Sequence, residues 1–303
     1  MKRSFLLVSG LLAIAVLSAF GQGVTGLSSS SSMGADGVMR GQATFQISKF
    51  LPPIVTNAPY SGEEVTESSQ TLADGTHITR KIPGPLQKTW RDSQGRVRTE
   101  GRRFAFMGGR NVDPDAPPAL YQISDPVAGY IYVVDNLNRV AHREQVEARP
   151  QRPALRRVDP SLAGVSGYPG TVGVVGGRGG GGGGRAGVGL DAQGSRPRPE
   201  VTAEDLGTKM IDGVLVTGTR RTSVIPEGME GNDRPMTTTN EIWRSKELQL
   251  IVLSVNYSPA DGTSTTKIAH LSTAEPDPAL FMVPPSYTVV DEKGSFTIKW
   301  GEQ

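Results

Sequence analysis

Alternation of side chains along short extended segments constrains the fold of this sequence more than any other feature. From Tyr60 onward, segments rich in Val, Thr, Ile and Tyr are separated by turn residues such as Asp92-Ser93-Gln94-Gly95 and Asp212-Gly213. Successive side chains of an extended chain point to opposite faces, and Gly adopts the positive φ that tight hairpins require. The sequence therefore predicts a mainly β protein: a large curved antiparallel sheet, similar to a half-barrel, or a β-sandwich, with very few short helices and with disordered segments.

Two short segments carry the start signals of a helix. Thr202 and Asp205 occupy the first and last positions of a weak capping box, and Asp277 precedes Pro278, which suits an N-cap followed by the first helical residue. No long helical pattern follows either signal. Helices are therefore expected to be minor elements of the fold.

The N-terminus has the layout of a secretory signal peptide. Lys2 and Arg3 supply positive charge, an apolar run follows at 5–17, and small residues lead up to Gly21. A retained membrane anchor is the alternative, but roughly 20 predominantly apolar residues are needed to span a bilayer, and this run is shorter. We therefore expect a signal peptide over residues 1–21, export to the periplasm or the cell exterior, and no transmembrane span after the signal is removed.

Composition divides the rest of the chain into four parts. Residues 22–58 contain a run of serines with little periodicity and are expected to be a flexible leader, in which one short strand could form near 43–48. Residues 59–147 are expected to form the N-terminal part of a β-sheet domain, and residues 201–303 the C-terminal part of the same domain. Residues 148–200 are rich in Gly, Pro and Arg, so burial offsets little chain entropy and a disordered loop is predicted. The sequence leaves open whether this loop interrupts one sheet or separates two domains.

The composition removes several classes of site. The chain has no cysteine, which excludes disulfides, thiolate metal ligands and thiol nucleophiles. The formal net charge of +2 is too small to indicate a nucleic-acid partner. His77, His142 and His270 lie in strand-like segments and form no helical pair that would offer two imidazoles to one metal. We therefore expect neither a metal nor a cofactor.

Catalytic motifs are also missing from the sequence. Ser166, between Val165 and Gly167, comes closest to a nucleophile elbow, but it lacks the strand–turn–helix setting that the elbow needs. Asp113 and Asp115 flank a proline, a pattern typical of a solvated turn rather than a carboxylate pair. We therefore expect a non-enzymatic protein, with a hydrolase as the less favoured alternative.

A basic stretch offers a first candidate site. Residues 80–110 hold nine basic side chains against two acidic ones. Trp90, Phe104 and Phe106 are interleaved with the arginines, a combination that suits anionic polymers or lipid head groups. A solvated strand face with its aromatic side chains turned inward is the alternative. The candidates for an anionic-surface site are Arg91, Arg96, Arg98, Arg102 and Arg103.

A strand that is apolar on both faces offers the second candidate. Within residues 247–257, alternation places Leu250 and Val252 on one face and Ile251 and Leu253 on the other, so both faces need cover. An apolar ligand held by the sheet would supply that cover. The candidate ligand-binding residues are Trp243, Leu250, Val252 and Leu253.

Several short sequence segments resemble segments of known proteins. As a set, four segments resemble a group of exported bacterial proteins that have no assigned function. They are residues 71–76, 91–100, 123–126 and 275–287. The C-terminal half is more distantly similar to the periplasmic lipoprotein-carrier and envelope-stress-sensor superfamily. The matching features are Trp243 before a hydrophobic strand, the Asp261-Gly262 turn, Asp277 with Phe281, and Pro284-Pro285 with Tyr287. That superfamily implies a curved antiparallel half-barrel whose hollow takes acyl chains and is closed by helices. This chain departs from it in its shortage of helices, its glycine insertion and its basic N-terminal half.

These observations lead to two hypotheses about function. The first is an exported, non-enzymatic binding or envelope-associated protein that holds an apolar or lipid ligand in a curved β-sheet. The alternative is a structural or protein-interaction module of the cell envelope. The expected partner is accordingly a lipid or another envelope protein.

Overall fold

The computed structural model of this chain describes residues 23–33, 39–82, 84–101, 118–147 and 199–301. Several sequence predictions fall outside these residues: the signal peptide at 1–21, the arginines Arg102 and Arg103, the turn residues Asp113 and Asp115, the aromatic residues Phe104 and Phe106, and positions 148–198 of the predicted disordered loop. No helix in the described ranges is both long enough and apolar enough to cross a membrane.

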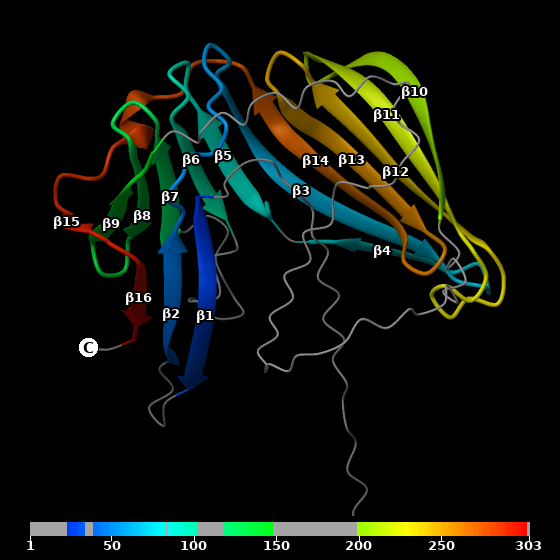
Figure 1. The fold of residues 1–303 in the computed structure, drawn as a ribbon, viewed down its shortest axis with the longest axis horizontal. Helices are drawn as coiled ribbons and strands as arrows, with labels where there is room; N and C mark the ends of the chain where they lie inside the picture. Colours follow the sequence, from blue (N-terminus) through cyan, green and yellow to red (C-terminus); the bar gives the residue numbers. More distant parts are fainter. Residues whose placement is uncertain (1–22, 34–38, 83, 102–117, 148–198, 302–303) are drawn as a thin grey trace, which may run out of the picture. The chain divides into compact units, whose positions relative to one another are not determined.

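Thirteen strands form one large sheet (Figure 1). Its strands are β3 (Tyr60–Thr71), β4 (His77–Lys81), β5 (Gln87–Arg91), β6 (Val97–Gly101), β7 (Leu120–Asp125), β8 (Tyr130–Asp135), β9 (Val140–Gln145), β10 (Glu200–Ile211), β11 (Val214–Ile225), β12 (Met236–Ser245), β13 (Leu250–Ser258), β14 (Gly262–Ser272) and β15 (Thr288–Asp291). Their order is β10-β11-β12-β13-β14-β3-β5-β6-β7-β8-β9-β15, with β4 paired to β3. Neighbours are antiparallel except β9 and β15.

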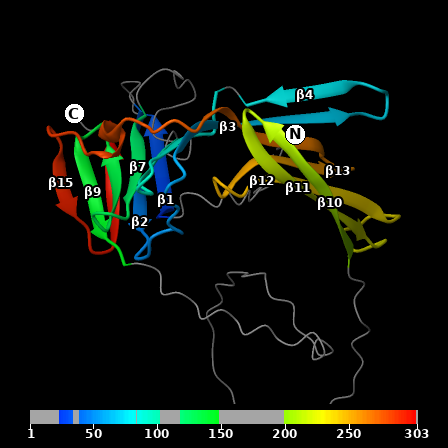
Figure 2. The ribbon, with the colours of Figure 1, turned by 90° about the horizontal axis from the view of Figure 1, so that it is seen from above.

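The large sheet is open and curved. Among the described strands, β10 and β15 each have one neighbour and end the sheet, so it does not close into a barrel. Figure 2 shows the strands from β3 through β14 to β10 following a curve. The prediction of a mainly β protein with a large curved antiparallel sheet is confirmed.

Strands from both sides of residues 148–198 pair directly. β3 lies beside β14, and the opposed Thr66 and Thr266 have their hydroxyl oxygens 2.9 Å apart. β9 lies beside β15, with His142 opposite Val290. One sheet is therefore built from two stretches of chain that are far apart in sequence.

A second, three-stranded sheet contains part of the predicted flexible leader. Its order is β1 (Val24–Met33), β2 (Met39–Ile47) and β16 (Ser295–Trp300). Phe45 and Ile47 of β2 are buried with Phe296 and Ile298 of β16 in one cluster, together with Ile131 of the large sheet. The prediction of a flexible leader is thus wrong for β1, and β2 is longer than the short strand considered near 43–48. The reason is that every second residue of β2 is apolar and packs on the core. The serine-rich β1 then pairs with β2 through backbone hydrogen bonds.

The two predicted helix starts have opposite outcomes. Pro278–Phe281 form the 3₁₀ helix η3, and the Asp277 carboxylate accepts a hydrogen bond from the Ala279 amide at 2.9 Å, as an N-cap should. The helix start predicted at Thr202 is wrong, because that residue lies in β10 and opposes Thr222 of β11. Strand pairing over the whole length of β10 outweighs a weak local capping signal.

Candidate functional site

The four predicted apolar ligand residues lie in one cluster. Trp243, Leu250 and Val252 are buried there, and Leu253 packs against them half-buried. Val55, Ala58 and Tyr60, from the start of β3 and the segment before it, belong to the same cluster. Apolar side chains of the same chain therefore cover this face of β13.

A bulge brings Leu253 to the same cluster as Val252. Trp243 lies opposite Leu253, whereas Arg244 lies opposite Ile251, so β13 has one extra residue at this point. Such a bulge interrupts strict alternation. It explains why Leu253, which alternation places on the other face from Val252, contacts the same apolar group.

The Trp243 side chain is enclosed by groups of the large sheet. Gly218 lies directly opposite, and a Cβ atom added there would lie 2.6 Å from the Trp243 ring. Lys209 Nζ lies 3.6 Å from the ring centroid, a cation–π contact. The indole N–H donates to Glu241 Oε1 at 2.6 Å, and this bond, together with Arg220, holds the pKa of Glu241 below its ordinary value. The polar atom of Trp243 is therefore already used within the fold.

Arg91, predicted on an anionic surface, is buried. Only 1% of it is exposed. Its Nε donates to the Ala58 carbonyl at 2.8 Å and its Nη2 donates to the Leu248 carbonyl at 2.7 Å. Its guanidinium carbon lies 4.7 Å from the centroid of the Tyr60 ring. The prediction is wrong for Arg91, because this side chain joins β5 to two chain segments inside the core.

The other two described arginines of that prediction are also engaged internally. Arg96 Nε lies 2.6 Å from Asp92 Oδ2, and the Arg96 guanidinium carbon lies 5.2 Å from the centroid of the Phe281 ring. Arg98 pairs with Glu100, and the Arg98 guanidinium carbon lies 3.7 Å from the centroid of the Tyr121 ring. Their side chains are 20% and 14% exposed. These arginines therefore do not form an open positive surface, because each one pairs with a nearby acidic side chain and contacts an aromatic ring.

Tyr60 makes the buried arginine site sensitive to high pH. Burial raises the pKa of Tyr60 to about 12, and the Arg91 charge opposes that rise. An unfolded tyrosine ionises near pH 10, so the unfolded state loses its proton first. We expect the free energy of unfolding to fall by about 2–3 kcal/mol between pH 10 and 12. Tyr60→Phe should remove this fall in denaturant titrations at each pH, and an identical fall in the variant would contradict it.

His142 belongs to an attachment between β9 and the chain after β15. Its Nδ1 lies 2.7 Å from Glu292 Oε1, and its ring stacks on Phe296 with centroids 4.3 Å apart. Nearby, Arg143 pairs with Asp291 at 2.6 Å. Within the described ranges, His, Asp and Glu side chains form no group that could hold a metal ion. The contacts of His142 are those of a residue that fastens two segments together.

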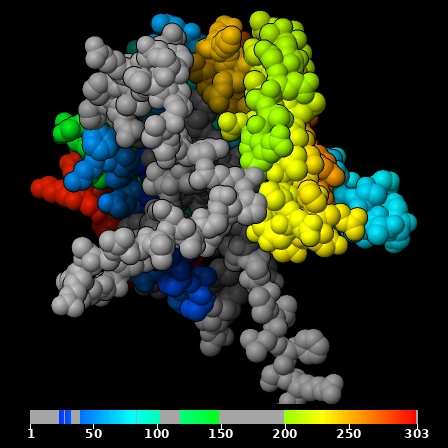
Figure 3. Space-filling view, turned by 45° about the vertical axis from the view of Figure 1, so that its right-hand side comes forward, coloured from blue at the N-terminus to red at the C-terminus, as the bar shows by residue number. Residues whose placement is uncertain are grey.

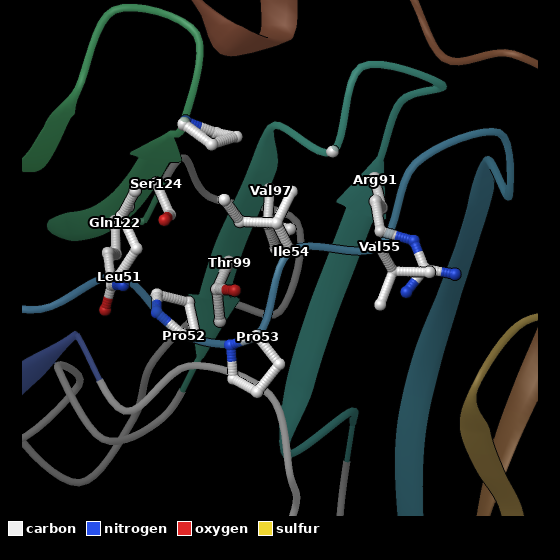
Figure 4. A pocket seen from close by; sticks show the side chains of 12 residues that line it. Leu51, Pro52, Pro53, Ile54, Val55, Arg91, Val97, Thr99, Gln122 and Ser124 are labelled. Atoms are coloured by element: carbon white, nitrogen blue, oxygen red, sulfur yellow. The ribbon is translucent and has the colours of Figure 1, made fainter. Parts of the chain in front are cut away.

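A pocket lies beside Arg91 (Figure 4), and it is too small for a ligand. It is lined by Leu51, Pro52, Pro53, Ile54, Val55, Arg91, Gly95, Val97, Thr99, Gln122, Ser124 and Pro126. Its cavity volume is about 20 Å³, enough for one water molecule. Small-molecule sites are typically about 300–1,000 Å³. The pocket is therefore a packing gap between the segment after β2 and the strands β5 to β7.

The open end of the large sheet is the feature that sequence reasoning missed. β10 has twelve residues, and all its side chains are exposed except those of Leu206 and Ile211. Figure 3 shows the β10 and β11 hairpin, in lime, at the surface. Met210 and Leu215 oppose each other across the hairpin and are 61% and 58% exposed. Alternation identifies a strand, but only the sheet order reveals that this one is an edge.

Comparisons with known proteins give distant likenesses only. No protein-family model matches the sequence, and no curated protein matches it. An uncharacterized conserved protein from Thermus thermophilus is 9% identical, with a TM-score of 0.30 over 78% of this chain and 91% of that one. The MucA/MucB complex of Pseudomonas aeruginosa is 12% identical, with a TM-score of 0.33 over 77% of this chain and 58% of that one. At these TM-scores the likenesses indicate nothing about function, and the superfamily resemblance stays a prediction.

Proposed function

We propose that this protein is an exported, non-enzymatic binding module of the cell envelope that binds another polypeptide by adding a strand to β10. The observation that carries the proposal is the open edge itself. Within the described residues, β10 pairs with β11 on one side and with nothing on the other. An unpaired edge presents a row of backbone N–H and C=O groups, which an extended peptide can match.

The length and exposure of β10 support this function. Its twelve residues span about 40 Å at the usual rise per residue, longer than the common strand of five or six. Val201 is 54% exposed and lies opposite Ser223 of β11. Ser223 and Leu215 are an even number of residues apart on β11, so their side chains point to the same face. Val201, Met210 and Leu215 therefore lie on one face. Backbone groups would give affinity, and these apolar side chains would give selectivity.

The edge has one protective device. A bulge lies between Asp205 and Gly207, where Gly207 has φ of 75° and its amide donates to Asp205 Oδ1 at 2.8 Å. Bulges and charges blunt edge strands against uncontrolled pairing. Here the bulge leaves two regular segments, 200–205 and 207–211, each as long as a typical strand. This arrangement favours binding of a selected peptide over open-ended association.

The apolar-ligand hypothesis has weaker support. Its four residues are packed against Val55, Ala58 and Tyr60 of the same chain. Entry of an acyl chain would have to displace that packing. Export is supported by the charged and apolar pattern at residues 1–21, which is a property of the sequence.

Site-specific photo-cross-linking in intact producing cells tests the proposal. A photo-reactive residue is placed at Thr208, exposed on β10, and as a matched control at Thr237, exposed on the interior strand β12. We expect one protein adduct from position 208 and none from 237. Hydrogen exchange on the purified pair should then show slowed exchange of β10 amides, with β12 amides unchanged.

Two results would contradict the proposal. Equal adducts from positions 208 and 237 would mean contact without strand addition. Stoichiometric lipid in native protein, found by mass spectrometry together with no protein adduct, would favour the apolar-ligand hypothesis instead.

A further inference from the structure

The bulge in β10 places two opposite charges on one face of this edge strand. Glu204 lies opposite Arg220 of β11, and Lys209 lies opposite Val216. Arg220 and Val216 are an even number of residues apart on β11, so Glu204 and Lys209 share a face. These two residues are an odd number apart in the sequence, which on a regular strand would put them on opposite faces. The extra residue of the bulge removes that difference.

The other face of β10 carries apolar side chains at matching positions. Ala203 lies opposite Arg221 of β11 and Met210 lies opposite Leu215. Arg221 and Leu215 are an even number of residues apart, so Ala203 and Met210 also share a face. Both side chains are exposed. The first half of β10 therefore offers an acid and an apolar residue, and the second half offers a base and an apolar residue in reverse order.

The two charges of β10 are only partly used within the chain. Glu204 Oε2 lies 3.3 Å from Arg220 Nη1, but the same guanidinium also lies 3.0 Å from a carboxylate oxygen of Glu241. One cation is thus shared between two acids, and the Glu204 side chain is 63% exposed. Lys209 is exposed, and its Nζ contacts the neutral ring of Trp243. Both groups can therefore take a further partner of opposite charge.

We propose that the polypeptide which adds to β10 is the β10 strand of a second copy of this chain, antiparallel to the first about a two-fold axis. The proposal rests on the proposed function, whose partner it names. The residues opposed between the two copies are Thr202 with Ile211, Ala203 with Met210, and Glu204 with Lys209.

This register satisfies both faces of the paired strands. The two side chains of each opposed pair share a face, as an antiparallel pair requires. The two-fold axis makes every contact occur twice, so Glu204 and Lys209 of each copy meet the opposite charge. A two-fold interface uses the β10 edges of both copies, so association at this edge ends at a dimer. That outcome suits an edge with a bulge that blunts uncontrolled pairing.

Sedimentation velocity of the purified mature protein tests the charge pairing. We expect a concentration-dependent equilibrium between monomer and dimer. Glu204→Lys and Lys209→Glu should each weaken dimerisation by about tenfold, because like charges then oppose each other at two places. The double variant restores opposite charges and should recover dimerisation. Glu204→Lys and the double variant lose the same Arg220 pair, so the recovery reports contact between copies. Glu230→Lys, exposed in the loop after β11, is the control and should leave dimerisation unchanged.

Cysteine pairs test the register, because the chain has no cysteine of its own. Ala203→Cys with Met210→Cys places thiols directly opposite between copies. Within one copy these positions lie roughly 20 Å apart along β10, too far for a disulfide. Mild oxidation should therefore give a disulfide-linked dimer on a non-reducing gel. Ala203→Cys with Thr208→Cys shifts one thiol by two residues, or about 7 Å, and should remain monomeric.

Three results would overturn the proposal. They are a protein that sediments as a monomer at every concentration, a double charge variant that dimerises no better than either single variant, and equal oxidation of the two cysteine pairs. The photo-cross-link at position 208 separates this failure from failure of the proposed function. An adduct with a different protein, found together with a monomer, would leave strand addition standing and remove the second copy as its partner. No adduct together with a monomer would remove both.

Discussion

Replacing Arg91 with alanine is expected to lower the free energy of unfolding by about 3–5 kcal/mol. The side chain is 1% exposed and donates to the carbonyls of Ala58 and Leu248, which belong to two other segments of the fold. Truncation would leave both acceptors without this donor and remove the cation from the Tyr60 ring. Arg91→Lys should lose part of this energy, because an ammonium lacks the planar fork that reaches two acceptors.

Chemical denaturation monitored by tryptophan fluorescence measures this effect. The matched control is Arg234→Ala, since the Arg234 side chain is 81% exposed and pairs with Asp233 at 3.6 Å. Exposed pairs contribute little, so we expect a change within about 0.5 kcal/mol for the control. If Arg91→Ala were as mild as Arg234→Ala, Arg91 would lie on the surface, as the sequence analysis predicted.

Replacing Leu250 with alanine should cost about 2–5 kcal/mol of unfolding free energy. Leu250 is 4% exposed and packs in the cluster that includes Val252 and Trp243. Leu215→Ala is the control, because Leu215 is 58% exposed, and its substitution should change stability by less than about 0.5 kcal/mol.

The same pair of variants separates the two hypotheses about function. If Leu250 packs in a filled core, Leu250→Ala lowers stability whether or not lipid is present. If Leu250 lines a lipid site, the lipid-free protein should tolerate Leu250→Ala, and the loss should appear in fatty-acid binding. Fluorescent fatty-acid titration of both variants, alongside denaturation, decides between these results.

Much of the fold could be predicted because its signals are local. The Asp212-Gly213 turn joins β10 and β11, and both residues have positive φ, as a tight hairpin requires. The start of η3 follows from Asp277 and Pro278 alone. Leu250 and Val252 lie in a strand whose apolar side chains need cover, and they are buried. These features depend on a few neighbouring residues, so one sequence contains enough information.

The remaining features depend on contacts between distant parts of the chain. Arginine is usually exposed, and nothing beside Arg91 in the sequence indicates that Ala58 and Leu248 place carbonyls around it. The serines of β1 have low strand propensity, and they form a strand because β2 lies alongside. The edge position of β10 follows from the order of the whole sheet. Composition and alternation do not encode that order.

The large sheet, of which β10 forms one end, requires strands from both sides of residues 148–198 to pair directly. The chain has no cysteine, so a double variant Thr66→Cys, Thr266→Cys can form one disulfide only. These residues lie directly opposite on β3 and β14. The control, Thr66→Cys with Thr263→Cys, moves one partner by three residues, or about 10 Å along the strand, beyond the reach of a disulfide.

Mass spectrometry after mild oxidation and thiol alkylation gives the answer. The 66–266 pair should be nearly fully oxidised within single molecules, while the 66–263 pair should remain alkylated. Free thiols in both variants, or equal oxidation of both, would contradict the single sheet.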